Sequence, residues 1–337
     1  MRSGRSPLSV AIMRAAADDI DAGGPVAELF RDIPTPPGSV PTLRLLAALH
    51  HLVLSGRAPE LVPFYPSAGG RRPPDGVWPA ALEALAGHAA WVHDRLLRPV
   101  QTNEPGRAAA LFAGLLWLAD RYRRPIRLLE IGASAGLNLL VDRFCYTAGA
   151  LTLGVPSSPV RFSEPWAPPP RIGLARAAQS LHIVERAGCD RAPLDPTDHE
   201  DRLTALSYIW SDEPERFERT RAALALAAED PPEVVERAAE AWLPEALADA
   251  DDECLTVVWQ SVVRQYVDAA AWENIEAAFR GALRGRSERP LVWLRLEPSG
   301  EDRNRGFTLS IVDGAAGGPR RVAGCGYHGP PVVWQAP

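Results

Sequence analysis

A short glycine-rich stretch of the sequence offers two kinds of chemistry. Residues 127–144 have the sequence RLLEIGASAGLNLLVDRF, in which an apolar run ends in a loop from Gly132 to Gly136. In the pattern G-x-S-x-G, Ser134 would stand on a sharp turn as an attacking nucleophile. With Glu130 included, the same stretch is a strand, an acid and spaced glycines, which would cradle a cofactor. Ser134 would then be a loop residue beside that cofactor.

Polar residues also follow two further apolar runs. Gln260 and Ser261 come directly after LTVVW (255–259), and Glu297 ends PLVWLRLE (290–297). If both runs are parallel strands, their carboxyl ends meet the glycine loop at one edge of a sheet, where such sheets bind ligands. We therefore expect Gln260 and Ser261 among the catalytic residues.

Arg264 and Tyr266 are candidate substrate-binding residues. They lie in SVVRQY, just beyond the second of these runs. A guanidinium in a pocket can hold a substrate carboxylate through two parallel hydrogen bonds. An arginine on a helix surface is the commoner case, so both interpretations of Arg264 stay open.

The segment VQTNEPGR (100–107) carries a second pair of candidates. Thr102 or Asn103 can cap the helix that follows, which is a purely structural role. Arg107 is harder to explain, because a cation near a helix N-terminus opposes the helix dipole. We expect Asn103 and Arg107 to help form the substrate pocket.

The number and spacing of histidines and cysteines, and the absence of lysine, exclude several kinds of catalytic site. All 36 basic residues are arginines, which excludes a lysine Schiff base or a P-loop lysine. The four cysteines lie far apart and form no C-x-x-C pair, which fits a reducing cytoplasm. His88 and His93 miss the i,i+4 spacing of a metal-binding pair on a helix. We therefore expect no metal site. His50 and His51 lie on an apolar helix, and we expect one of them in the core and the other on the surface. His328, in GYHG, is the expected general base.

Charge and hydropathy limit the partners. The net charge of -6 argues against a nucleic-acid backbone or an anionic membrane as the main partner, because both attract cations. The first residues contain no continuous apolar stretch, since Arg14, Asp18 and Asp19 interrupt it, and no run of about 18 apolar residues follows. We therefore expect no signal peptide, no membrane span and a small-molecule substrate. The oligomeric state is not indicated.

Hydrophobic periodicity changes near residue 124. Before it, apolar residues recur at helical spacing in 41–56, 78–98 and 104–122, with no convincing strand. After it, short apolar runs alternate with helical stretches. The predicted strands are 126–131, 160–162, 233–238, 255–259 and 290–297, with a helix at 137–144, a turn at 188–190 and an antiparallel hairpin from 307–314 and 322–334.

Alternating strands and helices imply a parallel sheet covered on both faces. The predicted fold class is therefore α/β. An all-helical N-terminal domain (1–124) precedes a Rossmann-like domain (125–337), whose mostly parallel sheet ends in a C-terminal antiparallel hairpin.

The position of the glycine loop favours the cradle over the nucleophile. The nucleophile elbow of α/β-hydrolases follows an interior strand, and its oxyanion hole uses a loop after an earlier strand. Here the strand at 126–131 is the first in the chain, so that earlier strand is missing. An α/β-hydrolase-like esterase with Ser134 as nucleophile stays an alternative, because His328 fits the order serine, acid, histidine.

Three segments carry a resemblance to a known family. LLEIGASAGLNLLVDRF, VQTNEPGR and YHGPPVVW together resemble an uncharacterised bacterial family classed as a domain of unknown function, over nearly the whole chain. At fold level this family is similar to class I S-adenosylmethionine-dependent methyltransferases. The resemblance implies S-adenosylmethionine as cofactor, held by Glu130, Gly132, Ser134 and Gly136.

In methyltransferases an acid after the second strand pairs with both ribose hydroxyls. AGCDRAP is similar to that turn and makes Asp190 the candidate. The spacing departs from the pattern, because 54 positions separate Gly136 from Asp190 where about 20 is usual. Glu164 is the fallback, and Glu240 is a weak candidate for a contact near adenine. A solvated surface acid explains Asp190 or Glu164 equally well.

Together these observations predict an S-adenosylmethionine-binding protein, a methyltransferase acting on a small molecule. One alternative stays open besides the esterase. Glycine-rich turns occur in many α/β proteins without binding a ligand, and the chain would then be a non-catalytic Rossmann module whose helical domain binds a protein partner.

Overall fold

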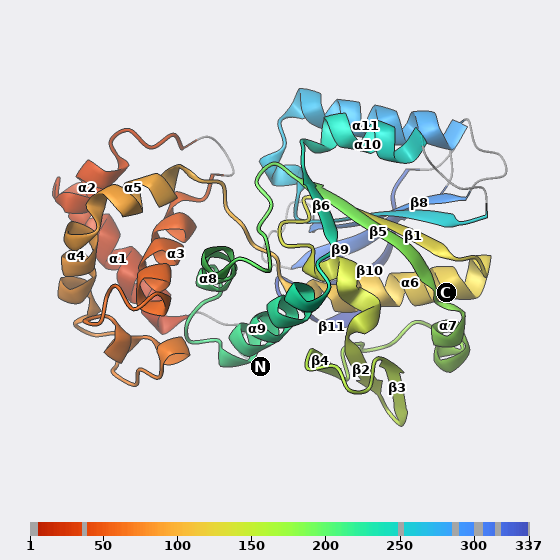
Figure 1. Ribbon diagram of the computed structural model, residues 1–337, viewed down its shortest axis with the longest axis horizontal. Coiled ribbons are helices and arrows are strands. Elements are labelled where there is room, and N and C mark those ends of the chain that lie inside the picture. The colour runs from red at the N-terminus through yellow and green to blue at the C-terminus, as the bar shows by residue number, and fades with distance from the viewer. Residues whose placement is uncertain are drawn as a thin grey trace. The chain divides into compact units, whose positions relative to one another are not determined.

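The computed structural model describes residues 6–35, 39–248, 253–284, 290–299, 306–313 and 318–335. The chain divides into two compact units, which Figure 1 shows as ribbons. The helical unit comprises Met1–Thr102 and Leu194–Arg221, and the sheet unit comprises Asn103–Pro193 and Ala222–Pro337. The chain therefore passes between the units three times.

Helices of the helical unit pack around one apolar core that includes Ile12, Leu49 and Leu85, each at most 1% exposed. Four of the α-helices described in this unit begin at a proline, whose fixed φ suits the first helical turn. In chain order the elements are α1 (Pro7–Asp21), α2 (Pro25–Phe30), α3 (Pro41–Leu54), η1 (Val62–Phe64), η2 (Pro66–Ala68), α4 (Val77–Gly87), α5 (Ala89–Leu97), α8 (His199–Ser207) and α9 (Pro214–Glu229). The last of them continues into the sheet unit.

The helix predicted at 78–98 is in fact two helices, α4 and α5. The first ends at Gly87, and His88 leaves the helical region with φ -128° and ψ 24°. Glycine is a poor helix former, which favours a break here. The imidazole Nε2 of His88 lies 3.0 Å from the carbonyl oxygen of Arg57, so the break also places a side chain against the end of α3.

Both adjacent histidines of α3 are buried, which corrects the expectation that one lies on the surface. His50 and His51 are 3% and 2% exposed. The cover is α8, a segment about 150 positions away in sequence, so the local pattern gave no sign of it. His50 Nδ1 lies 3.1 Å from the carbonyl oxygen of Ser207, and Nε2 lies 2.7 Å from Ser67 Oγ.

The sheet unit contains an eight-stranded, mostly parallel sheet in the order β11-β10-β9-β8-β7-β1-β5-β6. Strands β6, β5, β1, β7 and β8 run parallel, and β9, β10 and β11 are each antiparallel to their neighbours. The predicted α/β class with an antiparallel C-terminal part is confirmed. The strands are β1 (Ile126–Ile131), β5 (Ile183–Asp190), β6 (Glu233–Glu236), β7 (Leu255–Ser261), β8 (Leu291–Pro298), β9 (Phe307–Val312), β10 (Arg320–Gly326) and β11 (Gly329–Trp334).

Helices cover both faces of this sheet (Figure 1). On the face of α10 and α11, Phe279 joins Leu129 of β1 in one core cluster. On the face of α6, Gly114 allows close packing, because a Cβ there would stand 2.9 Å from Leu294 Cδ1. The helical elements are η3 (Pro105–Arg107), α6 (Ala108–Tyr122), η4 (Leu137–Arg143), α7 (Leu174–Ser180), α10 (Ala239–Ala248), η5 (Arg264–Tyr266) and α11 (Ala269–Arg284).

The units differ from the division expected at residue 124. Helix α6 lies in the sheet unit, where it packs against β8, β11 and η4. Residues 194–221, expected in the C-terminal domain, belong to the helical unit. Periodicity predicts the helix at 104–122, but it does not show which core a helix joins.

A second, three-stranded sheet in the order β3-β2-β4 follows η4 in the chain. Only β4 (Arg161–Ser163) corresponds to a predicted strand. The other two, β2 (Cys145–Ala148) and β3 (Leu151–Gly154), form a hairpin at Gly149, which has φ 57°. This sheet and α7 lie between β1 and β5 in sequence, which explains why Asp190 comes so late after the glycine loop.

Two further local predictions are wrong, and the structure extends a third. Residues 137–144 form a 3-10 helix, η4, with non-helical ψ 17° at Leu140. The turn expected at 188–190 is the end of β5, because neighbouring β1 supplies the pairing Ile131 to Cys189. The predicted antiparallel C-terminal hairpin is present as β9 and β10, and β11 extends it to a three-stranded meander, because Tyr327 and His328 form a turn between β10 and β11. Residues 314–317 of its expected first turn lie outside the described residues.

The buried histidines predict acid sensitivity of the helical unit. Burial lowers the pKa of His50 to about 4. Below pH 6.5, the ordinary pKa of histidine, His50 binds a proton in the unfolded chain but not in the folded one. The free energy of unfolding therefore falls as pH falls from about 6.5 toward about 4, by up to about 1.4 kcal/mol per pH unit. We expect His50→Gln to flatten this slope in urea denaturation. His199→Gln, at an exposed position of α8, is the control; an equal slope in wild type and His50→Gln would contradict the assignment.

Candidate functional site

Polar side chains gather at the carboxyl edge of the parallel strands. Glu130 and Asp190 lie near the ends of β1 and β5, Ser261 ends β7, and Glu297 lies near the end of β8. Because β9, β10 and β11 alternate in direction, the β10–β11 turn that carries His328 lies at the same edge. Residues from five separate parts of the sequence thus meet at one edge of the sheet.

Strand β1 stands where the chain changes direction across the sheet. After β1 the chain places β5 and β6 on one side, then returns to place β7 and β8 on the other side. Doubly wound sheets bind ligands beyond the carboxyl ends of the strands at such a switch point. Glu130 pairs with Trp259 in the register of β1 and β7, so its side chain lies at this point.

Glu130 is buried with half of its carboxyl group unpaired. It is 1% exposed, and its Oε1 accepts a 3.4 Å hydrogen bond from Asn138 Nδ2. No hydrogen bond of normal geometry reaches its Oε2 or Asn138 Oδ1 among the described residues, although the indole N–H of Trp259 lies near enough to favour the ionised carboxyl group. Burial raises the pKa of Glu130 well above its usual value; the Asn138 hydrogen bond opposes this rise and the charge of Asp190 adds to it. A buried acceptor without a donor is the environment that a ligand would complete.

The glycine loop is held in a strained, closely packed conformation. Gly132, Ser134 and Gly136 have φ of 70°, 52° and 70°, in the left-handed region that favours glycine. A Cβ at Gly132 would lie 2.6 Å from a methyl carbon of Val263, so this position also needs the missing side chain for packing. Ser134 Oγ is buried and has no hydrogen-bond partner among the described residues.

Asp190 clamps this loop. Its Oδ2 accepts a 2.9 Å hydrogen bond from the backbone N–H of Ser134, and its Oδ1 accepts one of 2.9 Å from Ala192 N–H. The structure therefore gives Asp190 a role in holding the loop, and ribose binding stays a prediction. Glu164, the fallback, is exposed in the small sheet and accepts from the N–H of Gly149.

The segment around η3 places Arg107 at this edge. Arg107 is 7% exposed, its Nη1 lies 3.4 Å from both the carbonyl oxygen and Oγ of Ser261, and its guanidinium stacks 5.3 Å from the ring of Phe307. Asn103 Oδ1 accepts a 2.8 Å hydrogen bond from Leu137 N–H, so it anchors η4. The cap predicted for Thr102 or Asn103 is supplied by Glu104, which accepts from the N–H of Gly106.

His328 has a buried acid beside it. Its Nδ1 lies 3.7 Å from Oε2 of Glu104, which is 3% exposed. Its carbonyl oxygen packs so tightly on η3 that a Cβ at Gly106 would lie 2.0 Å from it. The arrangement fixes the backbone of the turn and places an imidazole next to a carboxylate, which is the pairing that general bases use.

Gln260 lies on the other face of the sheet from Glu130. It follows Trp259, the register partner of Glu130, and successive side chains of a strand point to opposite faces. Gln260 is fully buried and its Nε2 donates to Glu297 Oε1, which also accepts from the N–H groups of Val263 (3.1 Å) and Arg264 (3.2 Å). Gln260 and Glu297 thus hold the loop after β7.

Arg264 and Tyr266 are placed differently from each other. The guanidinium of Arg264 stacks 5.1 Å from the ring of Trp272 on α11 and donates to the carbonyl oxygen of Val267. It is therefore packed against a helix of the opposite face. Tyr266 is 40% exposed in η5. Glu240 pairs with Arg191 at 2.8 Å on α10.

The sequence analysis gave no role to Asn138 or to Glu104. A polar residue inside the apolar stretch LNLLV was a visible pattern that marked Asn138. The burial of Glu104 depends on the turn that carries His328, more than 220 positions away, and no local pattern encodes it.

Comparison with known proteins gives a family but no activity. A family model described as an uncharacterized protein conserved in bacteria (DUF2332) matches residues 1–334. No curated protein and no solved structure matches the chain. None of the helices in the described part of the chain has the length and hydrophobicity that a bilayer crossing requires. The described residues also contain no group of three or more histidine, cysteine or acidic side chains that could hold a metal ion.

The buried carboxyl predicts that Glu130→Gln raises the free energy of unfolding at about pH 8. Above pH 4.5, the ordinary pKa of a glutamate, Glu130 is ionised in the unfolded chain but still protonated in the folded one. The free energy of unfolding of the wild type therefore falls as pH rises, by up to about 1.4 kcal/mol per pH unit, until the carboxyl group of the folded protein ionises. Urea denaturation at several pH values measures the slope. Glu236→Gln, exposed at the end of β6, is the control. If wild type and Glu130→Gln share one slope, Glu130 is ionised in the folded protein.

Proposed function

The chain belongs to this uncharacterised bacterial family, and from its own residues we propose that it binds S-adenosylmethionine and transfers the methyl group to a small molecule. The observation that carries the proposal is Glu130, a buried acid with an unpaired oxygen beside a glycine loop at the switch point of the sheet.

The hydrogen-bond acceptors beside the loop fit a cationic ligand. S-adenosylmethionine carries an ammonium and a sulfonium group, and a buried carboxylate gains most from a partner that is charged and donates hydrogen bonds. Glu130 Oε2 and Asn138 Oδ1 are two buried acceptors without donors among the described residues. We assign the ammonium group to them, with Gly132 and Gly136 giving the backbone close approach to the ligand.

The order of the parallel strands supports the same proposal. Numbered along the chain, the five parallel strands lie in the order 3-2-1-4-5, which nucleotide-binding doubly wound sheets share. We therefore propose that the sheet unit is a Rossmann-like domain of the methyltransferase type. Two features depart from it: η4 replaces the α-helix expected after the loop, and the sheet ends in a meander of β9, β10 and β11.

The bound cofactor would supply an electrophilic methyl group. The protein's contribution is then mainly to orient the acceptor atom in line with that methyl group. Arg107 and Ser261 lie on the Glu130 face and would hold the acceptor substrate. His328, with Glu104 behind it, would take the proton from the acceptor atom.

The esterase alternative has less support. A serine nucleophile needs a base within hydrogen-bond reach. Ser134 Oγ has no hydrogen-bond partner among the described residues, and the imidazole of His328 lies beside Glu104.

Calorimetric titration with S-adenosylmethionine and S-adenosylhomocysteine tests the proposal. We expect wild type to bind both and Glu130→Gln to bind S-adenosylmethionine at least roughly tenfold more weakly, because a hydrogen bond to a charged group is lost. Glu130→Gln separates binding from folding, since it removes no apolar contact. Gly132→Val, which adds a clash with Val263, should abolish binding. Absence of heat from both ligands on folded wild type would rule the function out.

A further inference from the structure

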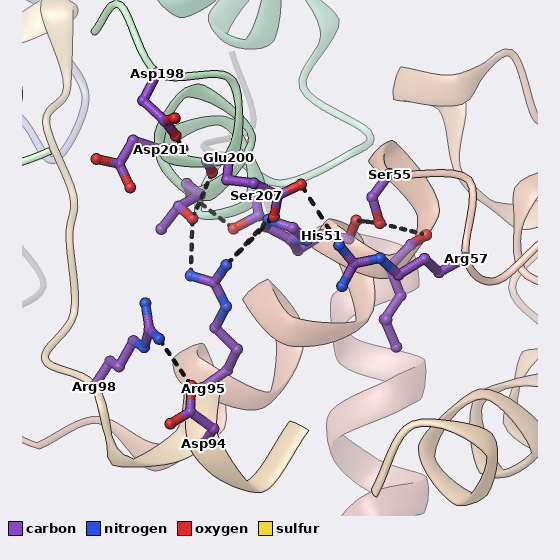
Figure 2. A network of polar contacts seen from close by, with 12 residues as sticks. His51, Ser55, Arg57, Asp94, Arg95, Arg98, Asp198, Glu200, Asp201 and Ser207 are labelled. Carbon is purple, nitrogen blue, oxygen red and sulfur yellow. Dashed lines mark hydrogen bonds and ion pairs between the residues drawn. The ribbon is translucent and has the colours of Figure 1, made fainter. Parts of the chain in front are cut away.

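In the helical unit, three nitrogen-bearing side chains converge on one carboxylate (Figure 2). Glu200, in the first turn of α8, has Oε1 at 3.5 Å from Arg57 Nη2. Its Oε2 lies 3.5 Å from His51 Nε2 and 3.7 Å from Arg95 Nη2. His51 comes from α3, Arg57 from the segment after α3, and Arg95 from α5. All of these elements belong to the helical unit.

Glu200 does not fill the space between these groups. Charge-assisted hydrogen bonds between nitrogen and a carboxylate are about 2.7–2.9 Å long, and all three distances are longer. Its side chain is 46% exposed, so it is free to swing into solvent. The donors are thus spaced more widely than one carboxylate can satisfy.

The cationic groups are held in place without Glu200. The guanidinium carbons of Arg57 and Arg95 lie 5.3 Å and 5.0 Å from the ring of Trp91. Arg95 Nη1 also donates a 2.9 Å hydrogen bond to Thr204 Oγ1. The His51 side chain is 2% exposed, its ring lies 5.0 Å from that of Trp91, and its Nε2 lies 3.5 Å from Arg95 Nη2. The arrangement is therefore preformed.

Two cations face one anion, and the other nearby acids are engaged elsewhere. Burial and the charges of Arg95 and Arg57 lower the pKa of His51 to about 3, so the imidazole is neutral. Asp94 pairs with Arg98 at 2.9 Å. Asp198 accepts from the N–H of Asp201 as the cap of α8. The cluster keeps a net positive charge.

We propose that Arg57, Arg95 and His51 form a binding site for a phosphate group, either the free ion or a small phosphate monoester, which displaces Glu200. A phosphate has three or four oxygens in a tetrahedral arrangement and can accept from donors on several sides at once. Guanidinium groups match this geometry better than an ammonium does. Glu200 then acts as a resident competitor whose carboxylate occupies the site in the free protein.

Titration calorimetry with inorganic phosphate at low salt tests this site in the full chain. We expect Glu200→Gln to bind phosphate about tenfold more tightly than wild type, because the competitor is gone. Arg57→Gln and Arg95→Gln should each weaken binding by about tenfold or more. Arg221→Gln, an exposed arginine of the same unit that is already paired with Glu218, is the matched control and should bind as wild type does.

A second titration, with glycerol phosphate, identifies the source of the group. Tighter binding than inorganic phosphate indicates a monoester, and equal or weaker binding indicates the free ion. No heat from phosphate on Glu200→Gln, equal affinity of Glu200→Gln and wild type, or the same heat from chloride at matched ionic strength would overturn the site. Glu200→Gln removes only an exposed charge and keeps the test valid if an arginine variant fails to fold.

Discussion

The burial of β1 is the constraint on which the sheet unit depends. All six of its residues are buried, because strands lie on both sides and helices on both faces. A charged side chain in such a strand must either find a partner or stay neutral. The burial of Glu130 and its raised pKa therefore follow from the central position of β1 in the sheet. The glycine loop comes directly after β1, so the strand also fixes where the loop begins.

The elements that the sequence predicts well are those whose pattern is complete within their own residues. Strand β1 is observed at the predicted bounds, and α3 begins at the predicted proline. The hairpin of β2 and β3 was missed, although Gly149 marked its turn, because each strand is only four residues long and too short for a clear alternation. The break at Gly87 and the 3-10 helix η4 depend on packing that no local window contains.

The residues of the candidate site also differ in how far the sequence predicts them. Glu130, Gly132 and Gly136 follow from one short motif, and their placement at a strand end was predictable. The clamp by Asp190 was hidden by the inserted small sheet, which lengthens the chain between β1 and β5. That Gln260 and Glu130 point to opposite faces follows from the register of β7 against β1, which the sequence of either strand alone does not contain.

The passage of the chain between the units has a consequence during synthesis. The α3 face that carries His50 and His51 leaves the ribosome about 150 residues before α8, which covers it. At roughly 5–20 residues per second, that face stays uncovered for on the order of ten seconds or longer. The helical unit can close only after β1, the glycine loop and β5 have been made, so its completion is tied in time to the growth of the sheet.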